Sequence, residues 1–308
     1  MKIELRVLAL LGLVAACGGG TSASTVAGDA GPSDGALTSA DGAADLGCGG
    51  SVGADVPEIY KRFFRCVDLS ATSTDVVVHT KGLPPYKTYY YGQSSPSFAP
   101  FDTSRGTAYK PNPNVLKEQS VTLTIPRAPV SRGIVITPAM IDGLVNGPTA
   151  SLDYKMGAAG VAINSVLVYN PLAAPGDNIE NEKFTFDDYD AHPDQRGAYH
   201  YHTTSKGPLE QLVKLGFATN STPGRAELEI YGVMCDGAFV LGCTELDGAA
   251  PDTGGLDAQN GHVHDLNGKD GAALATARYH IHLCPTGFAT APRKFTPQVQ
   301  YYDKCVVQ

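Results

Sequence analysis

Six of the eight histidines in this chain of 308 residues stand in pairs separated by one residue. The pairs are His200 with His202, His262 with His264, and His280 with His282. Side chains of a β-strand alternate between its two faces, so both imidazoles of such a pair point the same way, whereas in a helix they would diverge by about 200°. Because the neighbouring residues include Tyr, Ile and Thr, which favour strands, the spacing predicts paired imidazoles that bind one metal ion.

We predict a metal site or sites built from seven histidines. Imidazole ligation without thiolate suits copper(II), zinc, nickel or iron(II), and the affinity order of the divalent ions favours copper, with zinc next. Seven ligands exceed one tetrahedral shell, so either two ions bind or some histidines support the ligands or face a substrate. The alternative is a polar core of stacked Tyr and His that binds nothing. The predicted ligands are His192, His200, His202, His262, His264, His280 and His282.

Carboxylates and tyrosines lie beside these histidines in the sequence. The residues predicted to orient imidazoles are Asp190, Tyr199 and Tyr279. If the chain is an enzyme, its proton carrier is expected among Asp194, Asp236 and Asp265. The alternative for these carboxylates is that they are solvated loop residues.

The elements that must position these residues are mainly strands. Residues 119–126 alternate apolar and polar side chains in the period of a strand, and residues 160–170 and 227–242 continue the β character. Helix is scarce, and its best candidate is 207–216. The chain contains 35 glycines and 21 prolines, so turns must be many. The expected class is mainly β, an antiparallel sandwich-like domain with few short helices.

The chain also resembles itself. The segment GVAINSVLVYN from Gly160 aligns with GVMCDGAFVLG from Gly232, and farther along His192 aligns with His262. The Tyr-His-x-His segment at 199–202 aligns with the one at 279–282. We predict an internal duplication, with pseudo-repeats over about residues 160–204 and 232–284, each supplying a histidine-bearing loop and a Tyr-His-x-His strand.

The start of the chain has the features of a secretion signal. A basic beginning and a short apolar run precede Val14-Ala15-Ala16-Cys17, which resembles the lipobox of bacterial lipoproteins. Residues 1–17 are therefore predicted to be a lipoprotein signal with Cys17 as the lipidated residue, and an ordinary cleaved signal is the alternative. Residues 18–47 lack aromatic side chains and are expected to be a disordered tether before a single domain over 48–308. This predicts a lipid-anchored protein of the bacterial cell envelope, in the outer membrane and on its periplasmic or outward face.

The remaining six cysteines form an even set that suits disulfides in an oxidising compartment. Short spacings favour the pairs Cys48 with Cys66, Cys235 with Cys243, and Cys284 with Cys305. The net charge of −8 and the lack of a basic cluster argue against nucleic acid as a partner.

Four segments of the chain carry a resemblance to a known family. They are GVAINSVLVYN, DAHPDQRGAYHYH, IYGVMCDGAFVLG and NGHVHDLNGKDGAALATARYHIH. In order and character they resemble the YHYH domain family, named for the motif that stands here at residues 199–202, and the likeness covers about residues 75–288. The resemblance implies a secreted or lipoprotein-type protein and implies no particular activity. The second motif departs from the family pattern, since Ile281 stands where a tyrosine is expected.

Three functions are consistent with these residues. The first is an extracytoplasmic lipoprotein that binds a transition metal, copper before zinc, through its paired histidines. The second is a metalloenzyme, oxidative or hydrolytic, that uses the same histidines with an open coordination position. The third is a module that binds a carbohydrate, a peptide or another cell-envelope component and has a structural His and Tyr core. Its stacking surface would be formed by Tyr86, Tyr89, Tyr90 and Tyr91.

Overall fold

The computed structural model describes residues 48–141, 152–174, 177–288 and 293–308. The predicted signal, the lipidation residue Cys17 and the tether lie outside the described residues. No helix in the described part of the chain is long and apolar enough to cross a membrane.

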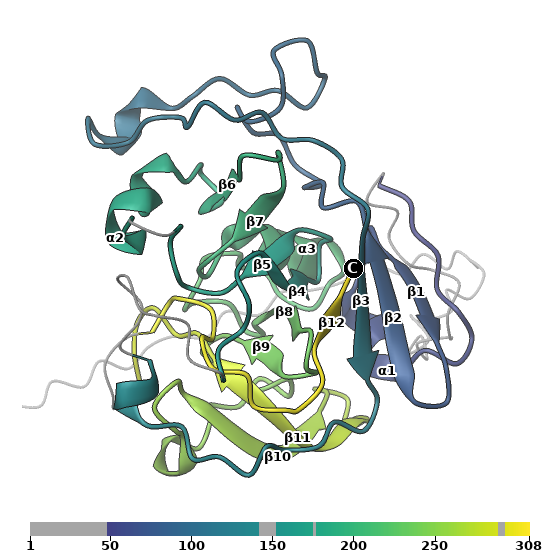
Figure 1. Ribbon diagram of the computed structural model, residues 1–308. Helices are drawn as coiled ribbons and strands as arrows, with labels where there is room; N and C mark the ends of the chain where they lie inside the picture. Colours follow the sequence, from purple (N-terminus) through teal and green to yellow (C-terminus); the bar gives the residue numbers. More distant parts are fainter. Residues whose placement is uncertain (1–47, 142–151, 175–176, 289–292) are drawn as a thin grey trace, which may run out of the picture. The chain divides into compact units, whose positions relative to one another are not determined.

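The chain is mainly β, as predicted, and its strands form two sheets (Figure 1). The smaller sheet is antiparallel and has the order β1-β2-β3-β12. Its strands are β1 (Asp68–Ala71), β2 (Asp75–Thr80), β3 (Val121–Pro126) and β12 (Val306–Val307). Val78 and Leu123 from this sheet lie in one core with Val161 and Val233 from the larger sheet. The two sheets are therefore held together by shared apolar packing.

The larger sheet carries the paired histidines and has the order β10-β11-β9-β8-β4-β5-β7-β6. Figure 1 shows β6 and β10 at opposite ends of this sheet. Its strands are β4 (Ala158–Ala162), β5 (Leu167–Tyr169), β6 (Ala191–Pro193), β7 (Tyr199–Tyr201), β8 (Ile230–Met234), β9 (Phe239–Leu241), β10 (Gly261–Asn267) and β11 (Ala273–His282).

The pairing of strands in one half of this sheet is repeated in the other half. The hairpin β4–β5 pairs through β5 with the parallel strand β7, and β6 pairs antiparallel with β7. In the same way β8–β9 pairs through β9 with the parallel strand β11, and β10 pairs antiparallel with β11. The register also agrees, because His192 lies opposite His200 and His262 lies opposite His280. This is the pairing that two copies of one unit would have, and the duplication itself stays a prediction from the sequence.

The two halves meet at the antiparallel pair of β4 and β8. A Cβ atom at Gly160 would lie 2.6 Å from the carbonyl oxygen of Val233, and one at Gly232 would lie 2.3 Å from that of Val161. Both strands therefore need glycine where they approach each other at the middle of the sheet.

Helices are few and short. The helix predicted at 207–216 is confirmed as α3 (Lys206–Lys214), which Ser205 caps by accepting a hydrogen bond from the amide of Gly207. Leu209 and Leu212 bury one face of α3, and Gly216 follows it with a φ of 77°. The other α-helices and the 3-10 turns are α1 (Glu58–Phe63), α2 (Ile179–Glu182), η1 (Thr103–Arg105), η2 (Pro138–Met140), η4 (Lys183–Thr185) and η5 (Thr253–Gly255).

Six cysteines form three disulfides, and only one of the predicted pairings is confirmed. Cys48 is bonded to Cys66 as predicted. The predicted pairs of Cys235 with Cys243 and of Cys284 with Cys305 are wrong. The disulfides are instead Cys235–Cys305 and Cys243–Cys284. Cys235 and Cys243 are close in sequence but stand at opposite ends of the β8–β9 hairpin, so their side chains cannot meet.

Candidate metal centres

The first group of histidines, called cluster 1, consists of His192, His200 and His202. His192 lies in β6 and His200 in β7, directly opposite each other, while His202 follows the end of β7. Their ligand nitrogens all lie within 4.8 Å of one another, and each side chain is at most 3% exposed. The prediction that His200 and His202 point the same way is confirmed, since their Nε2 atoms are 2.9 Å apart.

Hydrogen bonds at Nδ1 set the tautomer of every imidazole in cluster 1. His200 donates to the carbonyl of Ala198 at 2.8 Å, and His202 donates to that of Asn170 at 2.6 Å. The Nδ1 atom of His192 lies 2.7 Å from the hydroxyl of Thr185, which already donates its proton to the carbonyl of Glu182. All three Nδ1 atoms must therefore carry hydrogen, and a neutral imidazole then presents a lone pair at Nε2.

The Nε2 lone pairs of cluster 1 face one another and repel. A cation bound between them would be attracted to all of them and would remove that repulsion. Two unprotonated Nε2 atoms 2.9 Å apart repel unless a proton or a metal ion lies between them. Ligand nitrogens on a tetrahedral ion at about 2.05 Å would stand about 3.3 Å apart, which is close to the observed separation. The residues present therefore fit a transition metal ion.

Burial keeps the imidazoles of cluster 1 neutral. It lowers the pKa of His192 and His200 well below the usual range and that of His202 to about 4. The ring of Tyr169 stacks on His200 at 3.7 Å, and Phe186 contacts His192 edge-on at 4.8 Å. Neutral imidazole is the form that coordinates metal.

Glu182 brings a carboxylate to the side of cluster 1. Its Oε1 atom lies 3.6 Å from Nε2 of His192, and its buried Oε2 atom makes no hydrogen bond to a described residue. Burial, with a further contribution from Asp177, raises the pKa of Glu182 to about 7. Glu182 thus lies beside His192 but outside the set of three ligand nitrogens that lie within 4.8 Å of one another.

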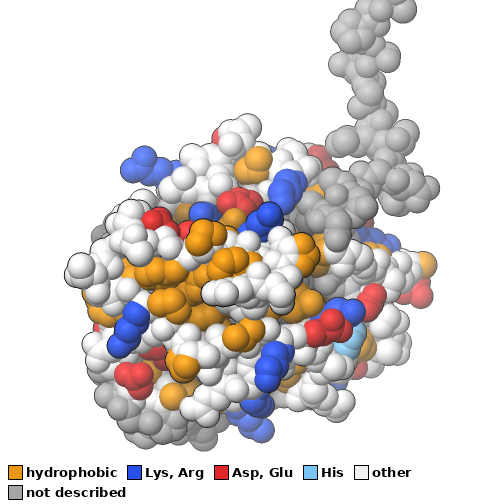
Figure 2. Space-filling model, turned by 90° about the horizontal axis from the view of Figure 1, so that it is seen from above, with side chains coloured by type: hydrophobic (Ala, Val, Ile, Leu, Met, Phe, Trp, Pro, Cys, Tyr) orange, Lys and Arg blue, Asp and Glu red, His pale blue; other side chains and the backbone are white. Residues whose placement is uncertain are grey.

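The second group, called cluster 2, consists of Glu245, His262, His280 and His282. His262 lies in β10 and faces His280 in β11, which also ends with His282. His280 and His282 are fully buried, and the Nε2 atoms of His262 and His282 are 3.2 Å apart. On the face of the protein shown in Figure 2, histidine contributes only one small patch of surface.

Cluster 2 uses backbone carbonyls at the same sheet positions as cluster 1. His280 donates from Nδ1 to the carbonyl of Arg278 at 3.0 Å, just as His200 does two residues back to Ala198. His282 donates to the carbonyl of Gly242, which aligns with the Asn170 that accepts from His202. In both clusters the fold therefore directs the Nε2 atoms inward.

The carboxylate of Glu245 is central to cluster 2. Its oxygens lie 3.1 to 3.2 Å from the Nε2 atoms of His262, His280 and His282. Despite these short distances, neither carboxylate oxygen accepts a hydrogen bond from a described residue. Burial opposes ionisation of Glu245, but its contacts with these three imidazoles hold the pKa of the carboxyl well below its usual range. A carboxylate amid imidazole nitrogens is a donor set that zinc and copper(II) accept.

His264 stands at the edge of cluster 2. Its Nε2 atom lies 3.0 Å from Oε1 of Glu245, but its side chain is 38% exposed and its Nδ1 bonds to the carbonyl of Asp265. Six of the seven predicted ligands therefore lie in the two clusters, and His264 lies beside the second. The eighth histidine, His79, is on β2 and contacts Thr122.

The predicted proton carriers have contacts that belong to turns and loops. Asp236 is fully buried and accepts hydrogen bonds from the amides of Tyr301 and Tyr302. Asp194 binds Arg196 and accepts from the hydroxyl of Tyr169, and Asp265 accepts from the amide of Ala277. Asp190, predicted to orient an imidazole, lies 3.7 Å from Arg105 instead. Apart from the carbonyl of Asp265, none of these hydrogen bonds or ion pairs involves a histidine.

Tyr199 and Tyr279 contact two aspartates that the sequence analysis missed. Tyr199 donates to Asp187, and Tyr279 donates to Asp257. The pattern Asp-x-x-Asp/Asn-Ala/Gly-His occurs at 187–192 and again at 257–262, so the aligned repeats contained the signal. Glu182 and Glu245 were missed for another reason, because they stand at different distances before His192 and His262.

The tyrosines proposed as a stacking surface are largely inside the protein. Tyr90 is 2% exposed and donates to the carbonyl of Thr185. Tyr86 stacks on Tyr189 at 3.5 Å, and Tyr89 packs against Phe101. These rings support the loops beside cluster 1 rather than offering an open platform.

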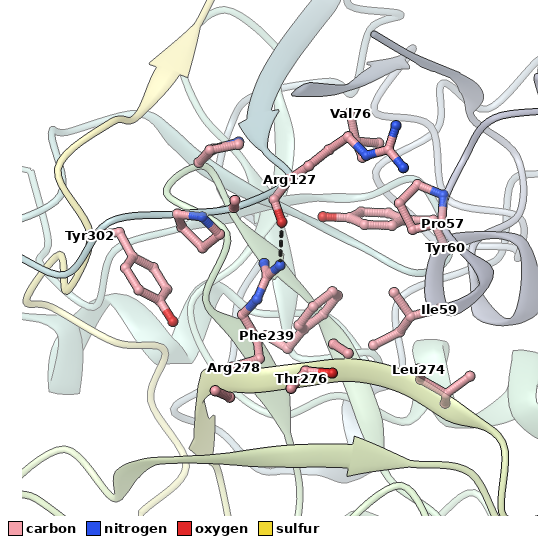
Figure 3. A pocket seen from close by; sticks show the side chains of 15 residues that line it. Pro57, Ile59, Tyr60, Val76, Arg127, Phe239, Leu274, Thr276, Arg278 and Tyr302 are labelled. Carbon is pink, nitrogen blue, oxygen red and sulfur yellow. Dashed lines mark hydrogen bonds between the residues drawn. The ribbon is translucent and has the colours of Figure 1, made fainter. Parts of the chain in front are cut away.

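A cleft of about 460 Å³ lies between α1, β11 and the residues that follow β3 (Figure 3). None of its fifteen lining residues is a histidine, cysteine or carboxylate. Figure 3 shows Arg278 reaching across it to the backbone oxygen of Arg127, a bond of 2.8 Å. The cleft therefore shares no lining residue with either cluster.

Comparison with known proteins gives one match. No curated protein and no solved structure matches this chain. The family model described as YHYH protein matches residues 141–244, a segment that contains the whole of cluster 1 and ends just before Glu245 of cluster 2. The resemblance seen in the sequence is thus confirmed for residues 141–244, a segment that is similar to the YHYH protein family.

Proposed function

We propose that the protein binds two transition metal ions, one at cluster 1 and one at cluster 2. The observation that carries the proposal is the shared tautomer of the buried imidazoles. The Nδ1 atoms of His192, His200, His202, His280 and His282 are bonded to backbone or hydroxyl oxygens, so Nε2 is the nitrogen that each of these rings directs into its cluster. A core of histidines that bound nothing would pair donors with acceptors instead.

The two ions would act independently. The clusters occupy opposite ends of the eight-stranded sheet, with β5, β4, β8 and β9 between β7 and β11. Five steps of about 4.8 Å between neighbouring strands place the clusters roughly 24 Å apart. This is far beyond the separation of about 4 Å in two-metal catalytic sites.

Copper(II) is the ion that we expect, with zinc next. Three imidazoles with a carboxylate and without thiolate suit both ions, and the affinity order places copper above zinc. Binding, for capture or buffering of the ion, is favoured over catalysis. The imidazoles are almost completely buried, and the cleft of Figure 3 supplies none of their neighbours.

We propose further that the protein is a lipoprotein of the cell envelope. The lipobox-like sequence before Cys17 supports this location, and the three disulfides suit an oxidising compartment. Mass spectrometry of the mature amino terminus tests it, since a diacylated Cys17 is expected. A soluble, unlipidated protein beginning at another residue would contradict it.

The metal proposal is tested by elemental analysis of protein purified without a histidine tag. Wild-type protein should hold about two copper or zinc ions per chain. The double variant His200→Ala/His202→Ala and its counterpart His280→Ala/His282→Ala should each hold about one, and the quadruple variant none. Circular dichroism would verify that each variant is folded.

Two results would overturn the proposal. One is a folded wild-type protein that stays metal-free after incubation with copper, zinc, nickel and iron(II). The other is metal that persists unchanged in the quadruple variant, because the ions would then be bound elsewhere.

A further inference from the structure

We propose that Asp257 and Tyr279 are positioning residues for cluster 2, and that Asp187 and Tyr199 do the same for cluster 1. Each aspartate joins the turn that precedes one histidine to the tyrosine that immediately precedes the His-x-His pair. This inference rests on the proposed function, because its consequence is the affinity of each cluster for its ion.

The turn before His262 is organised around the carboxylate of Asp257. Its Oδ1 atom accepts hydrogen bonds from the amides of Gln259 at 2.9 Å and Gly261 at 2.8 Å. Asn260 in this turn has a φ of 61°, in the left-handed region that asparagine tolerates. The other carboxylate oxygen, Oδ2, accepts a bond of 2.6 Å from the hydroxyl of Tyr279.

That hydroxyl bond spans the two strands that hold the ligands. Tyr279 immediately precedes His280 on β11, and Gly261 immediately precedes His262 on β10. A Cβ atom at Gly261 would lie 1.9 Å from the Tyr279 hydroxyl, so the ring is pressed against the turn. The side chain of Tyr279 thus fixes the distance between the backbone of His262 and that of His280.

The same arrangement stands at cluster 1. Oδ1 of Asp187 accepts from the amides of Tyr189 at 2.9 Å and Ala191 at 3.4 Å, and Oδ2 accepts from the hydroxyl of Tyr199 at 2.5 Å. Asp190 takes the place of Asn260, with a φ of 55°. Two independent turns with one geometry, each leading into a metal-facing histidine, indicate a common role in placing the ligands.

The second tyrosine of the motif has a different role. The hydroxyl of Tyr201 bonds to Tyr86 at 2.7 Å and to the amide of Asn164 at 3.1 Å. Ile281 replaces it in the other half, yet His280 and His282 still converge in cluster 2. Of the two tyrosines, the first is therefore the one that positions the histidines.

The test measures cluster 2 alone, in the His200→Ala/His202→Ala background. The substitution Tyr279→Phe keeps the ring and removes the hydroxyl. We expect it to weaken copper(II) binding, measured by competition with a chromogenic chelator, by about 10- to 100-fold. The visible spectrum of the cobalt(II) form should change as well, since it reports the coordination geometry.

Tyr301→Phe is the matched control. The ring of Tyr301 stacks on Tyr279 at 3.7 Å, but the hydroxyl bonded to Oδ2 of Asp257 is that of Tyr279. We expect this variant to keep the copper affinity and cobalt spectrum of its parent. Asp257→Asn is a second test of the same bond. If it fails to fold, the Tyr279→Phe result decides.

The outcomes separate the two proposals. A parent protein that binds copper, with Tyr279→Phe equal to Tyr301→Phe in affinity and spectrum, would overturn the positioning role and leave the metal site standing. A parent that binds no metal would instead contradict the proposed function itself. A Tyr279→Phe variant that loses thermal stability without metal, but binds copper as its parent does, would also count against positioning.

Discussion

Cluster 1 and cluster 2 share a scaffold and differ in charge. Both clusters are built on equivalent strands, and two imidazoles of each bond to equivalent backbone carbonyls. Glu245 lies within 3.2 Å of all three imidazoles of cluster 2, whereas Glu182 approaches only His192, at 3.6 Å. The comparison shows that the sheet sets the positions of the Nε2 ligand nitrogens. The loop between the second and third strands of each half supplies the carboxylate, and so sets the negative charge beside the ion.

The carboxylates should give the largest difference between the clusters. Glu245→Gln removes a charge that faces all three imidazoles, and we expect the affinity of cluster 2 for copper(II) to fall by about 100-fold or more. Glu182→Gln should weaken cluster 1 by only about 10-fold, because Glu182 contacts one imidazole. Chelator competition in the two single-cluster backgrounds measures both. Equal losses of copper affinity at the two clusters would contradict the proposed difference between their carboxylates.

The disulfide Cys243–Cys284 should matter to cluster 2 alone. Cys243 follows the glycine whose carbonyl holds His282, and Cys284 stands two residues after His282. The aligned positions near cluster 1 are Pro171 and Thr204, which cannot form such a bond. Replacing both cysteines with serine should lower the free energy of unfolding by about 2 to 4 kcal/mol.

The same double serine variant should weaken copper binding at cluster 2 by about 10-fold. Cluster 1 should keep its affinity. Denaturant unfolding and chelator competition on the same samples would check both effects. A loss of affinity at cluster 1 as large as at cluster 2 would show that the disulfide acts on the whole fold.

The pH dependence of stability should be set by cluster 1 in metal-free protein. Burial lowers the pKa values of its three histidines, to about 4 for His202, while the unfolded chain protonates them near pH 6.5. The unfolded state therefore binds more protons as pH falls from 6.5 to 4. Stability should decrease over that window by up to about 1.4 kcal/mol per pH unit for each histidine.

Glu182 opposes part of this loss, because burial raises its pKa to about 7 and the folded state takes up its proton first. The measurement is the unfolding free energy of chelator-treated protein at several pH values. The slope should flatten in His200→Ala/His202→Ala more than in His280→Ala/His282→Ala. The opposite order would mean that cluster 2 dominates the acid response.

The smallest expected effect concerns the rate at which the ion of cluster 2 exchanges with a chelator. His264 is the most exposed imidazole near either cluster, and cluster 1 has no counterpart to it in the described residues. His264→Ala should leave the occupancy of cluster 2 unchanged and alter its exchange rate with a chelator by only a few-fold. Stopped-flow transfer of copper to a chelator measures the rate. A loss of stoichiometric binding would make His264 an essential ligand instead.

Much of the site could be predicted because it depends on local geometry. The His-x-His spacing predicted that His200 and His202 converge, since the alternation of a strand requires no knowledge of the fold. Ile281 departs from the family motif between the two histidines, and both His280 and His282 nevertheless lie in cluster 2.

The remaining parts depend on chain paths that spacing does not reveal. Glu245 reaches cluster 2 from a loop whose length has no equivalent in the other half. The pairing of Cys235 with Cys305 follows from the course of a hairpin and of the carboxyl-terminal segment, so the nearest cysteine in sequence was the wrong partner. The turns at Asp187 and Asp257 were predictable in principle, because both halves repeat their pattern.

The order of strands in the large sheet gives the ions a mechanical role. β6 and β10 are its two outermost strands, and each is only partly held by one neighbour. Outermost strands are where a sheet begins to fray and where foreign strands attach. An ion in either cluster would bind one histidine from the outermost strand and one from the neighbouring strand. These are His192 and His200 at one end of the sheet, and His262 and His280 at the other. Metal supply would then regulate how readily the borders of the sheet open to proteases or to other chains.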